Sequence, residues 1–210
     1  MNLEKYYEIR YNFFKWRTSQ GVVVKTIMSL AVAAMTGIMA QIVIPLPWTP
    51  VPITGQTFAV LLSGVILGRY WGGISQLFYV ILGAAGISWF AGAKGGITVL
   101  LGATGGYLIG FILASLFIGH FIDRYISARK FKHILILMLI ANFVLIYVPG
   151  AIGLAFWQMS KGIQPTIWNI LAMGILPFIP GDLIKIFGVS IVTKAIVPKE
   201  AYGDEIDRRK

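Results

Sequence analysis

Long apolar runs with almost no charge constrain the fold of this chain more than any other feature of its sequence. Of its 210 residues, 57% are hydrophobic and 12% are charged, which is about half the charged share of an ordinary soluble domain. A helix of about 20 apolar residues crosses a bilayer and satisfies its own backbone hydrogen bonds on the way. The sequence therefore predicts an all-α integral membrane protein.

Six apolar segments are separated by polar, proline-rich or glycine-rich stretches, and we expect each segment to form a transmembrane helix. They lie near residues 22–44, 57–67, 71–87, 98–122, 134–157 and 167–197. The second is short for a bilayer, so tilting or extra residues from Gly55 and Gln56 would have to complete it. Asn142 is the most polar side chain of the fifth. These segments predict one six-helix membrane domain, residues 21–198.

The two ends of the chain differ from this domain. Residues 1–20 mix six charged residues with six aromatic ones and lack the apolar core of a secretory signal. This extension is predicted to be a helix at the membrane interface, with a loosely ordered lead-in as the alternative. Residues 199–210 are polar and are predicted to form a frayed tail.

The distribution of charge predicts the topology. With six spans, fifteen of the 18 Lys and Arg residues fall on the side of the two termini, whereas Lys94 and Lys161 lie opposite and Lys185 lies in the membrane. Lys and Arg concentrate in cytoplasmic loops, so both termini are predicted to be cytoplasmic in a protein of the cell membrane. The net charge of +10 then reflects topology and anionic headgroups, and no nucleic-acid partner is predicted.

Asp182 and Lys185 interrupt the last apolar segment. Charges at this depth cost several kcal/mol, which marks them as candidates for a functional site. Pro180 suits the first turn of a helix, so we expect a helix that begins near Pro180 and places Asp182 in its first turn, where the helix dipole favours a carboxylate. The i, i+3 spacing puts both side chains on one face. A ligand site and a buried structural ion pair both fit this stretch.

Two unusual loops are predicted to meet this pair at the outer face. Residues 45–56 contain four prolines and favour a stiff, extended loop, and residues 88–97 form a glycine-rich loop. In a six-span topology both loops emerge beside the start of the last helix. Trp89, Phe90 and Tyr107 would supply the apolar walls of a small-molecule pocket. The arrangement predicts a site that captures an external solute.

Other classes of function have less support. The chain has no cysteine, and its two histidines lie beside basic loops, so no metal site is predicted. No Walker A sequence is present. An enzyme would have only Asp182 and Lys185 as acid and base, so no catalytic residues and no bound cofactor are predicted. A purely structural membrane protein would leave the two outer loops unexplained.

Three stretches carry a resemblance to a known family. They are QIVIPLPWTPVPITGQTFAVLLSGVILG, GISWFAGAKGGITVLLGATGGYLIGF and ILPFIPGDLIK, and with the spans between them they cover most of residues 28–190. In this order they resemble BioY, the biotin-specific S component of energy-coupling factor (ECF) transporters. Ala103 departs from the proline that many relatives carry before TGGY.

The resemblance implies six transmembrane helices and a biotin site beneath the first outer loop and beside the third. Asp182 would accept from the ureido N–H groups or orient Lys185. Lys185 or Lys94 would meet the valerate carboxylate or another acceptor. The remaining implied ligand contacts are aromatic or weakly polar: Trp89, Phe90, Tyr107, Gln56 and Thr104.

The resemblance also implies partners. S components dock on a transmembrane coupling protein that two cytoplasmic ATPases drive, and toppling in the membrane carries the site inward. The implied docking stripe on the first helix is Ser29, Ala33 and Gly37, with packing inside the chain as the alternative. An S component for another vitamin, such as thiamine or riboflavin, is a second hypothesis, and homo-oligomerisation stays open.

Overall fold

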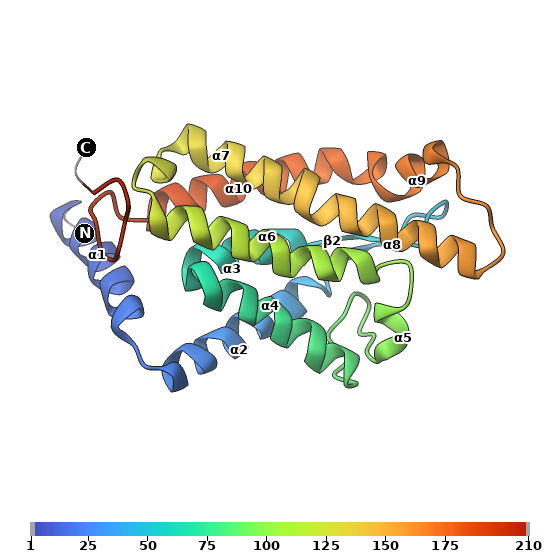
Figure 1. The fold of residues 1–210 in the computed structure, drawn as a ribbon, viewed down its shortest axis with the longest axis horizontal. Helices are drawn as coiled ribbons and strands as arrows, with labels where there is room; N and C mark the ends of the chain where they lie inside the picture. Colours follow the sequence, from blue (N-terminus) through green and yellow to red (C-terminus); the bar gives the residue numbers. More distant parts are fainter. Residues whose placement is uncertain (1–2, 209–210) are drawn as a thin grey trace.

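The computed structural model describes residues 3–208, and these residues form a bundle of helices with one small hairpin (Figure 1). Met1, Asn2, Arg209 and Lys210 lie outside the described residues. The elements in chain order are α1 (Leu3–Ser19), α2 (Val22–Met39), β1 (Val43–Ile44), β2 (Ile53–Thr54), α3 (Gln56–Leu67), α4 (Arg69–Ala84), α5 (Ile97–Leu100), α6 (Gly105–Arg124), η1 (Ser127–Arg129), α7 (Phe131–Ile140), η2 (Ala141–Ile146), α8 (Tyr147–Ser160), α9 (Ile167–Gly174), η3 (Leu176–Phe178) and α10 (Ile179–Ile196).

Within residues 3–208, four helical stretches are long and apolar enough to cross a membrane. They are Val22–Met39, Gly105–Arg124, Phe131–Ser160 and Ile167–Ile196. Between the first two lie α3 and α4, which have 12 and 16 residues. A chain with several such helices is a multi-pass membrane protein.

The proline-rich loop folds into the hairpin of β1 and β2, which pair antiparallel with Val43 opposite Thr54. The first apolar segment therefore stays helical only to Met39, because its last residues, near Pro45, are extended. The fourth segment also begins later than predicted. The short helix α5 precedes it, and α6 starts at Gly105.

The stretch from Phe131 to Ser160 is helical throughout, but its middle is wider than an α-helix. The segment η2 has π-helical hydrogen bonding and lies just before Pro149. Proline has no N–H and its ring clashes with the carbonyl four residues earlier, so a local change of pitch before it relieves the helix. The glycines of α6 pack here, since a side chain on Gly106 or Gly110 would collide with the backbone of Pro149 or Ile146.

The break in the last apolar segment matches the sequence prediction. Helix α9 ends at Gly174, the short 3₁₀ turn η3 follows, and α10 begins at Ile179 with Pro180 in its first turn. Asp182 lies in that first turn, as predicted.

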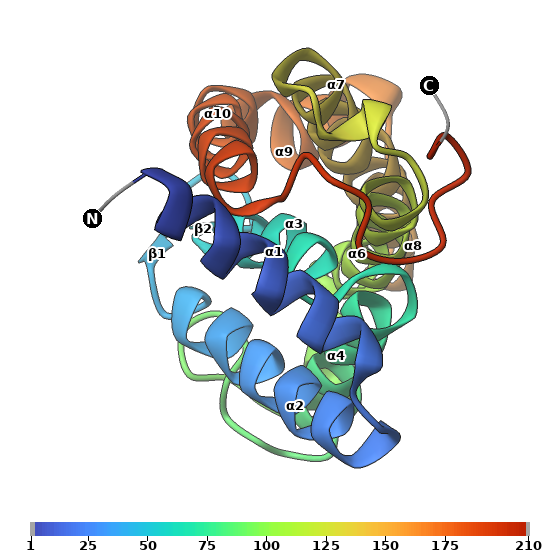
Figure 2. The ribbon, with the colours of Figure 1, turned by 90° about the vertical axis from the view of Figure 1, so that its left-hand side faces the viewer.

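Helix α1 lies across one end of the bundle (Figure 2). Phe14 is buried, and the guanidinium of Arg17 donates to the carbonyls of Val65 and Ile66 at the end of α3, over 3.2 Å each. Arg10 donates to the carbonyl of Val197 at the end of α10. These contacts satisfy carbonyls that a helix end leaves without partners. The N-terminal extension is thus helical and is tied to the bundle.

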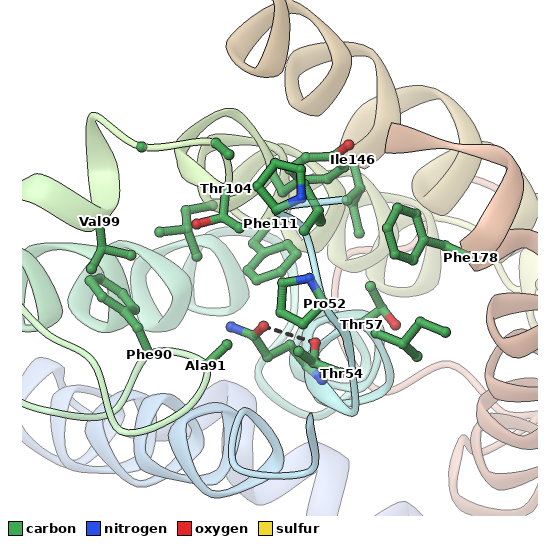
Figure 3. Close-up of a pocket in the computed structure, with 18 of the residues that line it drawn as sticks. Pro52, Thr54, Thr57, Phe90, Ala91, Val99, Thr104, Phe111, Ile146 and Phe178 are labelled. Atoms are coloured by element: carbon green, nitrogen blue, oxygen red, sulfur yellow. Dashed lines mark hydrogen bonds between the residues drawn. The ribbon is translucent and has the colours of Figure 1, made fainter. Parts of the chain in front are cut away.

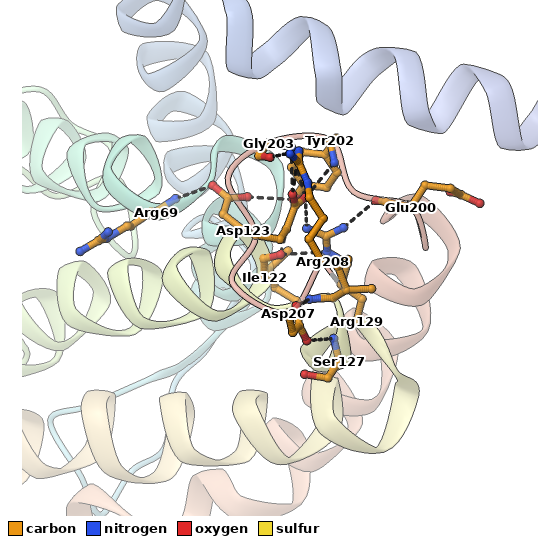
Figure 4. Close-up of polar contacts among 12 residues, drawn as sticks. Arg69, Ile122, Asp123, Ser127, Arg129, Glu200, Tyr202, Gly203, Asp207 and Arg208 are labelled. Carbon is orange, nitrogen blue, oxygen red and sulfur yellow. Dashed lines mark hydrogen bonds and ion pairs between the residues drawn. The ribbon is translucent and has the colours of Figure 1, made fainter. Parts of the chain in front are cut away.

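The tail is packed rather than frayed over residues 200–208, so that expectation is wrong for the described part of the tail. Tyr202 is buried close to Arg129 (Figure 4). Glu205 pairs with Arg129 at 2.7 Å. Asp207 accepts from the backbone N–H groups of Ile126 and Ser127 at 2.7 and 2.9 Å. Polar composition suggested fraying, but these residues bind donors at the ends of α6 and η1.

Candidate ligand-binding site

A cavity of about 360 Å³ lies where α3 and α10 begin, and α1 contacts the other ends of these two helices (Figure 3). Its walls come from the hairpin and the start of α3, the glycine-rich loop, α5 and α6, the η2–α8 junction, and the start of α10. The three features that the sequence placed at one face therefore surround one space. Most of the wall is apolar, with a few polar groups, as in small-molecule sites generally.

The carboxylate of Asp182 is buried and fully engaged with protein donors. Its Oδ1 lies 2.5 Å from the Lys185 ammonium and 3.3 Å from the Thr57 hydroxyl. Its Oδ2 accepts from the Asn142 amide at 2.9 Å and from the Tyr147 hydroxyl at 2.7 Å. Four side chains thus converge on one acid: Lys185 from the same helix, Thr57 from α3, and Asn142 and Tyr147 from the η2–α8 stretch. These donors offset the free energy that the carboxylate loses when it leaves water, which explains how an apolar bundle tolerates it.

Lys185 differs from Asp182 in that it keeps capacity for a ligand. Its ammonium also donates to the carbonyl of Thr54 at 2.8 Å. An ammonium has three N–H donors, so one remains after Lys185 donates to Asp182 and to Thr54. Lys185 lines the cavity, and its side chain is 18% exposed. The ion pair therefore holds one donor at the cavity wall.

Gln56 lines the cavity and ties its walls together. Its Oε1 accepts from the Thr54 hydroxyl at 2.8 Å, and its Nε2 donates to the Tyr79 hydroxyl at 2.7 Å. That hydroxyl donates in turn to the carbonyl of Trp89, 3.2 Å away. The chain of bonds joins the hairpin, α3, α4 and the glycine-rich loop, so Gln56 has a positioning role whether or not it meets a ligand.

Seven of the eight predicted ligand contacts line the cavity, and Trp89 does not. The seven are Gln56, Phe90, Lys94, Thr104, Tyr107, Asp182 and Lys185. The indole N–H of Trp89 donates to the carbonyl of Tyr79 at 2.9 Å, and its side chain packs on Gly37 of α2. Trp89 therefore supports the loop from behind, whereas its neighbour Phe90 faces the cavity.

The predicted docking stripe is inside the molecule. Ser29, Ala33 and Gly37 are all buried. The Ser29 hydroxyl donates to the carbonyl of Trp71 in α4 at 3.3 Å, and Gly37 lies against Trp89. Small residues allow close approach of helices, and here they bring α2 against α4 and the glycine-rich loop. The alternative of packing inside the chain is thus the one found, and the outer face of α2 carries Leu30, Ala34 and Ile38.

Sequence reasoning missed several residues around Asp182. Thr57 and Tyr147 line the cavity and bind the carboxylate, and Asn142 binds it from behind the wall. One feature of the sequence pointed to Asn142, because it is the most polar residue of its span. Nothing in the spacing indicated that Tyr147, five positions later, would share the same oxygen atom. Only the wide turn of η2 brings these two side chains to one point.

The site has no cluster of potential metal ligands: within residues 3–208, no group of three or more His, Cys, Asp or Glu side chains could hold an ion. The comparison with protein families decides the class of the chain, since the profile of the BioY family matches residues 13–201. The chain belongs to the BioY family. This confirms the resemblance that the three sequence stretches carry.

Similar proteins from distant organisms agree with this assignment. A probable biotin transporter BioY from Methanothermobacter thermautotrophicus is 63% identical over 150 residues, which are 71% of this chain and 96% of that protein. The biotin transporter BioY of Thermotoga maritima is 36% identical over 71% of this chain and 82% of that protein. These BioY relatives are named transporters rather than enzymes, which confirms the prediction of a non-enzymatic protein.

A solved structure also resembles this chain. The S-component for biotin from an ECF-type ABC transporter superposes with a TM-score of 0.67 and 28% identity, over 82% of this chain and 89% of that one. The BioY fold of the present chain is therefore that of an S component.

Proposed function

We propose that this chain captures external biotin in the cavity beside Lys185 and delivers it to the cytoplasm as an ECF S component. The observation that carries the proposal is the cavity itself. At its wall, one N–H of the Lys185 ammonium remains for a ligand, whereas the Asp182 carboxylate beside it already accepts from protein donors. The names of the BioY relatives and of the similar solved structure supply the ligand.

The charges around the cavity favour one orientation of biotin. Asp182 and Lys185 form a neutral pair at the buried end, whereas Lys94 is exposed in the glycine-rich loop. A ligand carboxylate at the buried end would leave a net negative charge in a medium of low dielectric constant, which is costly. The neutral ureido ring avoids this cost. We therefore place the ureido carbonyl near Lys185 and the valerate carboxylate near Lys94.

In this orientation Asp182 acts through Lys185. All four of its contacts are already made by protein donors, so it has little remaining capacity for ureido N–H groups. Phe90 and Tyr107 would pack on the rings and the tail of biotin. Thr104 remains available at the wall as a hydrogen-bonding group.

The proposed topology has six spans, with α3 and α4 as a short second and third span, and both termini in the cytoplasm of the cell. Figure 1 shows α1 and the tail at one end of the bundle and α5 at the other. The cavity belongs to the end with α5, because Thr98 and Val99 of α5 line it, and this placement supports the proposed topology. The excess of Lys and Arg lies toward the end with α1, and cytoplasmic loops carry such an excess.

Delivery would require partners, because the sequence has no nucleotide-binding motif. We propose an ECF transmembrane coupling protein and two ATPase subunits, because the similar solved structure is an S-component from an ECF-type ABC transporter. The outer face of α2 around Ala34 is available for lipid or for such a partner, whereas the stripe through Ala33 is not.

Isothermal titration of the purified protein with biotin tests the proposal. A dissociation constant weaker than about 10 μM, which corresponds to roughly −7 kcal/mol, would contradict it. Displacement of biotin by thiamine or riboflavin would indicate that the ligand is another vitamin. Asp182→Asn and Lys185→Ala should each weaken biotin binding at least about tenfold while the protein stays folded, because each removes one member of the neutral pair.

A further inference from the structure

The glycine-rich loop has a backbone that few other sequences could adopt. Gly92, Ala93 and Gly96 have φ angles of +71°, +55° and +95°. For Ala93 this left-handed conformation is unfavourable, so contacts outside the residue must hold it. Within the loop, the Phe90 N–H donates to the carbonyl of Lys94 at 2.9 Å. Phe90 and Lys94, which this turn positions, both line the cavity.

One side chain outside the loop makes three hydrogen-bond contacts with it. Gln41, just after α2, accepts from the Ala93 N–H at 2.8 Å with its Oε1. Its Nε2 lies 3.2 Å from the carbonyl oxygen of Trp89 and 3.3 Å from that of Phe90. Both ends of one carboxamide therefore bind the same loop, about 50 residues away along the chain.

A simpler role for Gln41 would be to finish α2, since its amide also lies 2.8 Å from the carbonyl of Gly37. That local bond explains neither the acceptor contact to Ala93 nor the two contacts to Trp89 and Phe90. The Trp89 carbonyl also accepts from the hydroxyl of Tyr79, a buried residue of α4. Two side chains therefore hold the loop, and of these Gln41 is the one that is exposed to water.

We propose that Gln41 is a positioning residue that latches the glycine-rich loop over the cavity and sets how long a bound ligand stays. This inference rests on the proposed function only for the identity of the ligand. Water competes for exposed hydrogen bonds, so each contact of Gln41 is weak and the latch can open. A lid that must admit and release a ligand needs such a reversible closure.

Two measurements on Gln41→Ala test the latch. The first is hydrogen–deuterium exchange of the loop in the purified protein without ligand, where exchange should rise about tenfold with little change elsewhere. The second is the dissociation rate of biotin, which should rise by about tenfold, because loop opening limits escape. Gln41→Glu replaces the donor amide by a carboxylate oxygen, which the carbonyl oxygens of Trp89 and Phe90 repel, so it should raise both values at least as much as Gln41→Ala.

Gln164→Ala is the matched control. Gln164 is a glutamine that is exposed, as Gln41 is, and it lies between α8 and α9 and does not line the cavity. It should leave loop exchange and biotin dissociation unchanged. Unchanged loop exchange in Gln41→Ala would overturn the latch, and so would faster exchange with an unaltered dissociation rate. If the wild-type protein did not bind biotin, the proposed function would fail, and loop exchange would still decide for or against the latch.

Discussion

The side-chain amide of Asn142 lies 2.9 Å from Oδ2 of Asp182, and the two residues are 40 positions apart in the sequence. The Tyr147 hydroxyl donates to the same oxygen atom at 2.7 Å. In a regular α-helix, residues five apart point in directions that differ by well over 90°. The π-helical segment η2 removes this difference, so a local irregularity before Pro149 completes the shell of the buried carboxylate.

Replacing Asn142 should therefore destabilise the protein. Asn142→Leu removes a donor to a buried carboxylate, and we expect the free energy of unfolding to fall by about 1.5–3 kcal/mol. Equilibrium unfolding in mixed micelles measures the change. Asn169→Leu is the control, because Asn169 is exposed on α9. Equal unfolding energies for the two variants would show that the Asn142 contact adds nothing.

The proposed orientation of biotin predicts different roles for two lysines. Lys94→Ala should weaken the binding of biotin by about threefold to tenfold and leave the binding of biotin amide, which has no carboxylate, nearly unchanged. Lys185→Ala should weaken both ligands alike, because both carry the ureido ring. Titration calorimetry with each ligand measures the four affinities.

Lys161→Ala is the control for this pair, since Lys161 is also exposed and does not line the cavity. It should bind both ligands as the wild type does. The opposite pattern, with Lys185→Ala selective for biotin over its amide, would mean that the carboxylate lies at the buried end.

The burial of Ala33 predicts different outcomes at two neighbouring alanines of α2. Ala33 is 0% exposed, and Ala33→Trp should destabilise the protein by about 1–3 kcal/mol and reduce biotin binding, because the ring has no space against α4. Ala34→Trp should preserve folding and binding, since Ala34 is exposed. If the outer face of α2 meets a partner, Ala34→Trp will lower biotin uptake by cells. Normal stability of Ala33→Trp would contradict the packing described above.

The docked tail should respond to acid. Burial opposes ionisation of Glu205, but hydrogen bonds from Arg129 and from the backbone N–H groups of Tyr202 and Gly203 outweigh it and lower its pKa. For Asp207, burial again acts in the opposite direction, and hydrogen bonds from Ser127 and Ile126 lower the pKa to about 2. Such groups stabilise the fold fully above their unfolded pKa of about 4, and the contribution is lost as pH falls toward the folded pKa.

Thermal unfolding between pH 7 and pH 2.5 measures this contribution. The melting temperature of the wild type should fall on acidification by more than that of Glu205→Gln or Asp207→Asn, which lack the titrating group. At pH 7 both variants should melt below the wild type. Identical pH profiles for all three proteins would show that the tail carboxylates do not stabilise the bundle.

Local rules in the sequence predicted much of the site. Pro180 correctly predicted where α10 begins, because its ring fits only the first turn of a helix, and so it placed Asp182 at the helix N-terminus. The sequence did not predict which small residues of α2 are buried, because a small residue fits both a packed face and an exposed face of a helix. Ala33 and Ala34 are chemically identical neighbours, and only the packing of α2 on α4 decides which of them is buried.

The sequence by itself determined that the chain is a helical membrane protein with a charged pair in its last span, because hydrophobicity and proline geometry act over a few residues. Tertiary structure alone decided what surrounds that pair. Thr57 meets Asp182 from α3, and Asn142 and Tyr147 meet it from the continuous helical stretch Phe131–Ser160. Trp89 turns away from the cavity, whereas Phe90 faces it. These placements depend on helix rotation and close packing between distant segments, which no local pattern specifies.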